Sequence, residues 1–295
     1  MRAPRHAGPL LALVALLAAT APCAASPTAC PDKFAGGIAP DLLNQKLAAR
    51  TAPLCFSAFA LLHSGVVRSA LWSAEHLTRD NLRRAKETDR VNAFHAEPLV
   101  PASDRSELSD YARSGYDRGH LAPSGDMPDP VSQNESFSLA NMIAQDPDNN
   151  RGLWEGVESA TRTLAMRSGE LYVVTGPIFH GTEIKSLKGR VLVPTHIYKA
   201  VYDPRTGRAG AYLVGNAPGM AWRAVSIAEL STLSGVDPFP GLPAATKAVA
   251  MPMPEPTPHG FNRGGGSASA GDAGGVVGYL EKNASWLTKK VLRSW

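Results

Sequence analysis

The spacing of the hydrophobic residues changes at Asn149, and this change limits the folds that the chain can adopt. The residues that recur after it at the spacing of an α-helix are Leu153, Trp154, Val157, Ala160, Thr161 and Leu164. Asn149 or Asn150 can cap the start of this helix, and Gly169 predicts its end.

Elsewhere the hydrophobic residues lie in short runs bounded by Gly, Pro or Asp, which are typical of β-strands. We predict strands in residues 54–62 and 65–72, joined by a turn at Ser64-Gly65, and in residues 171–175, 191–202 and 209–215. Residues 75–90 are charged, and we expect residues 86–90 to form a solvated loop. The chain therefore combines several strands with one long helix.

The first 25 residues have the layout of a signal peptide. Arg2 and Arg5 precede a hydrophobic run at residues 10–21, and small residues surround Ala25. The run is too short to span a bilayer. We expect cleavage after Ala25, which predicts a secreted or periplasmic protein with no membrane span in the mature chain; a retained anchor is the alternative.

The remainder divides into a predicted domain at residues 26–250 and a C-terminal segment at residues 251–295. Proline occupies every second position from Pro252 to Pro258, and Gly, Ser and Ala dominate residues 264–278. This composition predicts a mobile linker. Residues 279–295 could form a short basic amphipathic helix.

The number of cysteines is consistent with export. Removal of residues 1–25 deletes Cys23 and leaves Cys30 and Cys55. An even pair in an exported chain favours one disulfide, with two buried thiols as the alternative.

The composition supports a folded domain and only weakly indicates a partner. Hydrophobic residues make up 44% of the chain and charged residues 19%, which argues against wholesale disorder. A net charge of +4 suits an anionic partner such as nucleic acid or a membrane surface. Many secreted proteins are mildly basic, however, so the charge adds little.

A first polar cluster, residues 116–126, contains a candidate general base. His120 fits this role because imidazole titrates nearest to neutral pH. Asp117 could orient His120 or Arg118, or could simply form a turn, and Gly119 would let a substrate backbone approach closely. A lone histidine is usually structural, but its neighbours Asp117, Arg118 and Gly119 favour catalysis here.

A second polar cluster, residues 149–158, contains a candidate metal ligand. Asn150 offers an amide oxygen to Mg²⁺, which often takes only one or two protein oxygens; a helix cap is its other interpretation. Glu158 and Arg162 lie one helical turn apart and could hold a water of the metal's shell and a phosphate, or form an ordinary surface ion pair. No nucleophile elbow, dinucleotide-binding turn, Walker loop or zinc-type histidine spacing is present.

These residues resemble the DNA/RNA non-specific endonuclease family, the group of the Serratia nuclease and endonuclease G. The likeness rests on the run from Asp117 to Leu121, with Gly125 following, and on Asn150, Trp154, Glu158 and Arg162 at four-residue intervals. It covers about residues 54–245 and leaves both ends unexplained.

The resemblance implies an α+β protein with the ββα-metal nuclease fold, a mostly antiparallel central sheet flanked by helices. It implies that His120 is the general base and that Asn150 is the one direct ligand of Mg²⁺, or of Mn²⁺ or another divalent cation. Glu158 would hold a water of the metal's shell, Arg118 and Arg162 would contact phosphate, and Asn141 would support the site. The substrates would be DNA and RNA, cut to products with 5′-phosphates.

One departure and one alternative remain. Some members carry a catalytic arginine upstream, and the nearest match here is His76. A catalytically inactive protein that binds nucleic acid on a nuclease fold is the alternative to an enzyme. The presence of His120, Asn150 and Glu158 favours the enzyme.

Overall fold

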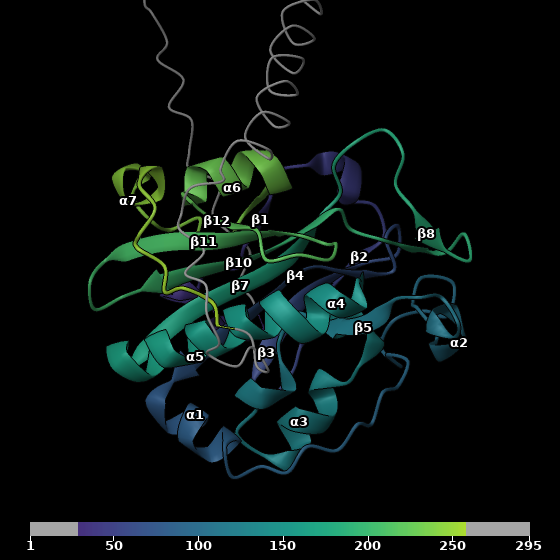
Figure 1. The fold of residues 1–295 in the computed structure, drawn as a ribbon, viewed down its shortest axis with the longest axis horizontal. Coiled ribbons are helices and arrows are strands. Elements are labelled where there is room, and N and C mark those ends of the chain that lie inside the picture. Colours follow the sequence, from purple (N-terminus) through teal and green to yellow (C-terminus); the bar gives the residue numbers. More distant parts are fainter. Residues whose placement is uncertain (1–28, 258–295) are drawn as a thin grey trace, which may run out of the picture.

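The computed structural model describes residues 29–257. The predicted signal peptide, Cys23 and the C-terminal segment from residue 258 onward lie outside these residues. The central element is a seven-stranded sheet with the strand order β12-β11-β10-β7-β4-β3-β2 (Figure 1). Every neighbouring pair in it is antiparallel. Its strands are β2 (Thr51–Cys55), β3 (Phe59–Ser64), β4 (Ser69–Thr78), β7 (Glu170–Ile178), β10 (His196–Asp203), β11 (Arg208–Gly215) and β12 (Trp222–Val225).

The strands predicted at residues 171–175 and 209–215 are confirmed as β7 and β11. The strand predicted at residues 191–202 is divided into β9 (Val191–Leu192) and β10, and the N-terminal strands are also divided differently. Residues 54–62 span parts of β2 and β3, because the chain turns at residues 56–58. This turn is held by Glu135, whose carboxylate accepts hydrogen bonds from the backbone N–H and the hydroxyl of Ser57 at 2.7 and 3.0 Å. Residues 65–68 are the next turn, so β4 begins only at Ser69 and continues to Thr78.

Helices cover both faces of the sheet (Figure 1). On one face lie α6 (Ile227–Ser234) and α7 (Ala244–Ala248), and Leu230 of α6 packs with Trp72 and other core residues. The long helix α5 (Glu155–Ser168) crosses the opposite face, where Val157 packs with Leu121 and Phe59.

A ββα unit lies on the α5 face. Strand β5 (Asp117–His120) pairs antiparallel with β6 (Met142–Gln145), and the chain continues through α4 (Pro147–Asn149) and a π-helical turn (Asn150–Trp154) into α5. Asp146 caps this helix by accepting from the backbone N–H groups of Asp148 and Asn149 at 3.0 Å. The predicted cap at Asn149 or Asn150 is therefore wrong, while the predicted end at Gly169 is confirmed.

The remaining elements are short. The helices are α1 (Arg79–Ala85), α2 (Leu108–Tyr111) and α3 (Pro130–Ser136); the strand pairs are β1 (Asp41–Leu42) with β13 (Val236–Asp237) and β8 (Ser186–Leu187) with β9 (Val191–Leu192). Short 3₁₀ turns occupy Pro31–Lys33, Ala35–Gly37, Gln45–Leu47, Ser124–Asp126 and Leu139–Asn141. Within residues 29–257 no helix is long and hydrophobic enough to cross a membrane.

Residues 251–257 pack against the domain, contrary to the prediction of a mobile linker from residue 251 onward. The backbone N–H of Met251 donates to the carbonyl of Ala209 at 2.8 Å, and the Tyr212 hydroxyl donates to the carbonyl of Pro254 at 2.8 Å. Met251 is buried in the space beside Gly210, where a Cβ would approach it to 3.0 Å. Contacts with the domain therefore extend beyond residue 250.

Cys30 and Cys55 form a disulfide that ties the N-terminal segment to β2, with their Cα atoms 6.2 Å apart. Because the bridge closes a loop of 25 residues, we expect its reduction to lower the free energy of unfolding by about 3 kcal/mol. Denaturant titration with and without reductant measures this loss. Intact-mass analysis after alkylation without reductant should show no adducts at these cysteines, and two adducts on native protein would contradict the bridge.

Candidate active site

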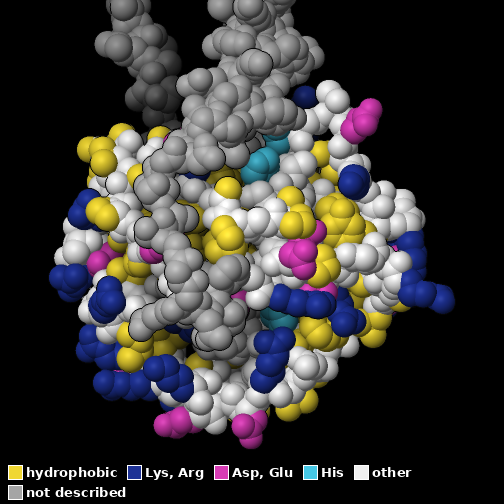
Figure 2. Space-filling view, viewed as in Figure 1, with side chains coloured by type: hydrophobic (Ala, Val, Ile, Leu, Met, Phe, Trp, Pro, Cys, Tyr) yellow, Lys and Arg dark blue, Asp and Glu magenta, His cyan; other side chains and the backbone are white. Residues whose placement is uncertain are grey.

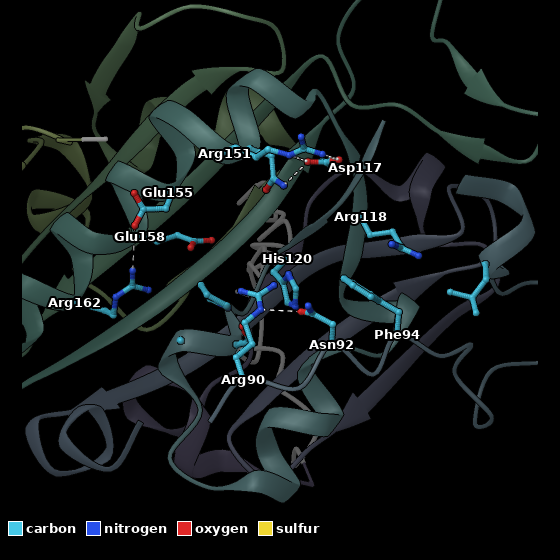
Figure 3. A pocket seen from close by; sticks show the side chains of 15 residues that line it. Arg90, Asn92, Phe94, Asp117, Arg118, His120, Arg151, Glu155, Glu158 and Arg162 are labelled. Atoms are coloured by element: carbon cyan, nitrogen blue, oxygen red, sulfur yellow. Dashed lines mark hydrogen bonds and ion pairs between the residues drawn. The ribbon is translucent and has the colours of Figure 1, made fainter. Parts of the chain in front are cut away.

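A polar cavity of about 790 Å³ opens between β5, the start of α5 and the loop after α1. The side chains that line it include Arg90, Asn92, Phe94, Asp117, Arg118, His120, Asn150, Arg151, Glu155, Glu158 and Arg162. Figure 3 shows Glu155, Glu158 and Arg162 on one side of His120 and Arg118 and Phe94 on the other. The cavity thus brings together all of the predicted site residues except Asn141.

His120 lies at the end of β5 and is 9% exposed. Burial, followed by the positive charges of Arg90 and Arg118, lowers the pKa of the imidazole to about 3. The ring is therefore neutral at physiological pH. Its Nε2 atom is buried and has no hydrogen-bond partner within residues 29–257, so Nδ1 is the nitrogen that can accept a proton from the cavity.

Gly119 provides space for a neighbouring side chain. A Cβ at this position would lie 1.9 Å from the side-chain oxygen of Gln145 on β6. The expectation that Gly119 admits a substrate backbone is therefore wrong. Gln145 fills the space and donates to the side-chain oxygen of Asn149 at 2.9 Å, which connects β5 and β6 to the helix that carries Asn150.

Asn141 lies behind the cavity wall and contacts the backbone that follows β5. It is fully buried. Its Oδ1 accepts from the backbone N–H of Ala122 at 3.0 Å, and its Nδ2 donates to the carbonyls of Ala122 and Ser136 at 2.8 and 2.9 Å. These bonds fix the backbone two residues after His120.

Asp117 orients Asn150. Its carboxylate accepts from the Nδ2 of Asn150 at 3.0 Å and from Arg151 at 2.6 and 2.8 Å. This carboxylate thus contacts neither of the partners that we proposed for it, His120 and Arg118. Because the amide nitrogen of Asn150 is engaged by Asp117, its Oδ1 is the atom of this side chain that can coordinate a cation.

Glu158 and Arg162 belong to a network of charges on α5 and the loop after β5. Arg162 donates to the buried carboxylate of Asp126 at 3.0 Å and lies 3.9 Å from Glu155. Burial raises the pKa of Glu158 to about 7, and Asp126 and Glu155 add to this effect against Arg162 and Lys199. Arg162 is thus held chiefly by Asp126. A cation in the cavity would stabilise the charged form of Glu158.

Arg90 lines the cavity, although we predicted only a solvated loop there. The Gln133 side chain of α3 accepts from the backbone N–H of Val91 at 3.2 Å and donates to the carbonyl of Asp89. These two hydrogen bonds fix the backbone on both sides of Arg90. A signal was present in the sequence, since Arg90, Asn92 and Phe94 alternate as they would in an extended segment, and all three line the cavity.

His76 lies outside the cavity. Its Nε2 is 2.8 Å from a carboxylate oxygen of Glu170, and its ring stacks on Tyr172 with the centroids 4.2 Å apart. His76, the nearest sequence match to the family's upstream arginine, therefore lies apart from the residues that line the cavity. The neighbouring Glu75 points to the α5 side of β4, where it lies buried near Asp126 and Lys199.

The cavity's donor atoms fit a hard divalent cation such as Mg²⁺. Asn150 offers an amide oxygen, and Glu155 and Glu158 offer carboxylates along the same wall; oxygen donors are the ligands that Mg²⁺ prefers. Among residues 29–257 no cluster of three or more His, Cys, Asp or Glu side chains is placed to hold a metal. An ion held through the single amide oxygen of Asn150 would keep most of its water shell, as Mg²⁺ commonly does.

Several known nucleases are similar to this chain. Nuclease C1 of Cunninghamella echinulata var. echinulata is 38% identical over 157 residues, which are 49% of this chain and 62% of that protein. A nuclease of Nostoc sp. is 37% identical over 196 residues, 61% of this chain and 70% of that protein. The human mitochondrial nuclease EXOG is 31% identical over 215 residues, 65% of this chain and 58% of that protein.

The fold has a match among solved structures. The crystal structure of the EndoG/EndoGI complex contains a chain with a TM-score of 0.56 and 25% sequence identity, and the match covers 62% of this chain and 84% of that chain. The predicted fold, α+β with the ββα-metal arrangement and a central antiparallel sheet, is confirmed. The profile of the DNA/RNA non-specific endonucleases matches residues 41–245. The chain therefore belongs to the DNA/RNA non-specific endonuclease family.

Proposed function

We propose that this chain is an exported, divalent-cation-dependent endonuclease that hydrolyses phosphodiester bonds of DNA and RNA and leaves 5′-phosphates. One observation carries the proposal. A neutral imidazole, the guanidinium groups of Arg90, Arg118 and Arg162, and the amide of Asn150 line a single cavity. These are the groups needed to activate water, bind phosphate and hold a cation.

His120 acts as the general base and takes a proton from the attacking water at Nδ1. In the substrate-free protein, burial and the nearby Arg90 and Arg118 lower the pKa of this imidazole. A phosphodiester anion bound to the two arginines offsets their positive charge. Substrate binding therefore increases the proton affinity of His120 at the stage when the reaction requires it.

The arginines bind the phosphate from two sides of the cavity. Arg118 lies over the Phe94 ring, with its Cζ 4.0 Å from the ring centroid. This contact holds the guanidinium at the cavity, where its N–H donors can bind phosphate oxygens. Arg162 approaches from α5 and is kept in place by Asp126.

Mg²⁺ or Mn²⁺ would be held by Asn150 and, when bound, would stabilise negative charge on the phosphate and on the leaving oxygen. Glu155 and Glu158 line the same wall and would accept hydrogen bonds from the ion's water shell. Asp117 would keep the amide of Asn150 in its coordinating orientation.

The proposal that the protein is exported rests on its N-terminal sequence. In that sequence Arg2 and Arg5 precede a short hydrophobic run and a group of small residues suited to cleavage. The disulfide between Cys30 and Cys55 supports an oxidising destination, secreted or periplasmic.

Substrate binding should depend on backbone charge and little on base sequence. Figure 2 shows Lys and Arg side chains gathered on the lower half of the face in view, over α1 and the nearby end of α5. Affinity for duplex DNA should therefore fall steeply with salt and differ little among sequences. Filter binding with Ca²⁺ in place of Mg²⁺ measures the salt slope, and a cleavage map restricted to one short motif would contradict this prediction.

The nature of the product ends tests the reaction itself. The chain should cut both a DNA duplex and a single-stranded RNA, and the new 5′ ends should accept label from polynucleotide kinase only after phosphatase treatment. Direct labelling without phosphatase would show 5′-hydroxyl ends and exclude the proposed hydrolysis.

A further inference from the structure

The ring of His120 is oriented by packing. In many hydrolases a carboxylate or carbonyl bonds to the second nitrogen of the catalytic imidazole and fixes the ring. Here Nε2 is buried and has no hydrogen-bond partner within residues 29–257. The neighbours of the His120 ring include two aromatic rings, those of Phe94 and Phe137.

The three rings contact one another. The His120 and Phe137 centroids are 4.9 Å apart with planes at 86°, and those of His120 and Phe94 are 5.9 Å apart at 51°. The two phenylalanines meet edge to face at 4.8 Å and 90°. These separations lie in the range in which aromatic pairs attract, so His120 rests in a cradle formed by Phe94 and Phe137.

Each ring of the cradle also contacts an arginine. The Cζ of Arg118 lies 4.0 Å from the Phe94 centroid, and the Cζ of Arg90 lies 5.3 Å from the Phe137 centroid. Both distances fall within the reach of a cation–π interaction. Each phenylalanine therefore contacts the imidazole and one guanidinium at the same time.

We propose that Phe94 and Phe137 are positioning residues that hold the imidazole of His120 and the guanidiniums of Arg118 and Arg90 in one fixed arrangement for phosphodiester cleavage. This inference rests on the proposed function for its catalytic consequence, while the arrangement itself rests on the ring geometry. The two phenylalanines come from different parts of the fold, since Phe94 precedes α2 and Phe137 follows α3.

The cradle also accounts for the protonation state of the base. Burial is the largest cause of the lowered pKa of His120, ahead of Arg90 and Arg118. Phe137 is fully buried, whereas Phe94 forms part of the cavity wall. The cavity is also lined by other charged groups, which belong to β5, the helical turn before α5, and α5 itself: Asp117, Arg151, Glu155, Glu158 and Arg162. Removal of the Phe94 ring should admit water beside the imidazole and raise its pKa towards the ordinary value of about 6.5.

The test combines ring substitutions with two measurements. The variants are Phe94→Ala, Phe137→Leu and Phe94→Tyr, with Phe239→Leu as the control because Phe239 is a buried ring on the α6 face that packs near Tyr202. The first measurement is the NMR titration of the His120 ring in metal-free protein, assigned with His120→Ala. The second is kcat on plasmid DNA with Mg²⁺.

We expect Phe94→Ala and Phe137→Leu to raise the titration midpoint of His120 by at least about one pH unit and to lower kcat about 10-fold. Phe94→Tyr, which keeps the ring, and Phe239→Leu should stay close to wild type. If Phe137→Leu does not fold, Phe94→Ala decides the matter, because Phe94 is only half-buried.

An unchanged midpoint together with a kcat within twofold of the control would overturn the proposal. The titration needs no turnover, so failure of the cradle can be distinguished from failure of the proposed function. Failure of the proposed function would appear as no cleavage of plasmid by the wild-type chain in Mg²⁺, whatever the midpoint, and full cleavage by His120→Ala would refute only His120 as the base.

Discussion

His120→Ala is expected to lower kcat about 10²–10⁴-fold, which is the usual contribution of a general base. His120 is the imidazole in the cavity, and its neutral state at physiological pH allows it to accept a proton. The affinity for DNA should change little, because the phosphate contacts are assigned to arginines. Initial rates and filter binding measure the two effects separately.

The control for this prediction is His180→Ala. His180 follows β7 and does not line the cavity, so its replacement should leave kcat unchanged. Cleavage by His120→Ala at a rate near that of the control would refute the assignment of the base.

Asn150→Ala is expected to abolish most of the activity, with only partial recovery at high Mg²⁺, since it removes the one direct protein ligand that we propose. Asn150→Asp keeps an oxygen in place and adds a negative charge, so Mg²⁺ affinity should hold or rise. The bound ion would then be a weaker Lewis acid, and turnover should be slow. Isothermal titration of Mg²⁺ together with initial rates separates the two variants.

The structure adds a second expectation for Asn150→Asp. The Nδ2 of Asn150 lies 3.0 Å from a carboxylate oxygen of Asp117, so the substitution places two carboxylates side by side. Metal-free Asn150→Asp should unfold at a lower temperature than wild type, and Mg²⁺ should reverse this loss. Asn134→Ala on the exposed side of α3 is the control. Normal Mg²⁺ binding and cleavage by Asn150→Ala would show that the ligand lies elsewhere.

The parts of the site that could be predicted are those encoded over short stretches of sequence. His120 and Arg118 belong to one strand, and Asn150, Glu158 and Arg162 follow a helical spacing. Local periodicity fixes which of these side chains share a face. These five side chains therefore line one cavity, whereas Asn141 lies behind its wall.

The missed features depend on contacts between distant parts of the chain. The alternation of Arg90, Asn92 and Phe94 indicates an extended segment but not its place at the cavity, which depends on the bonds of Gln133 in α3 to the backbone on both sides of Arg90. The turn between β2 and β3 contains neither Gly nor Pro and is stabilised by Glu135. The polar end of β4 was missed because Glu75 is buried on the α5 side of the sheet near Lys199, and burial raises the pKa of its carboxyl.

The most direct test of the central claim is the relaxation of a supercoiled plasmid by the wild-type chain in Mg²⁺, in Mg²⁺ with excess EDTA, and by His120→Ala in Mg²⁺. We predict rapid nicking and then linearisation in the first reaction and intact supercoiled plasmid in the other two over the same time. Nicking that persists in EDTA, or equal nicking by His120→Ala, would contradict a cation-dependent nuclease with His120 as its base. Intact plasmid in all three reactions, with DNA still bound, would instead identify a nucleic-acid-binding protein without activity.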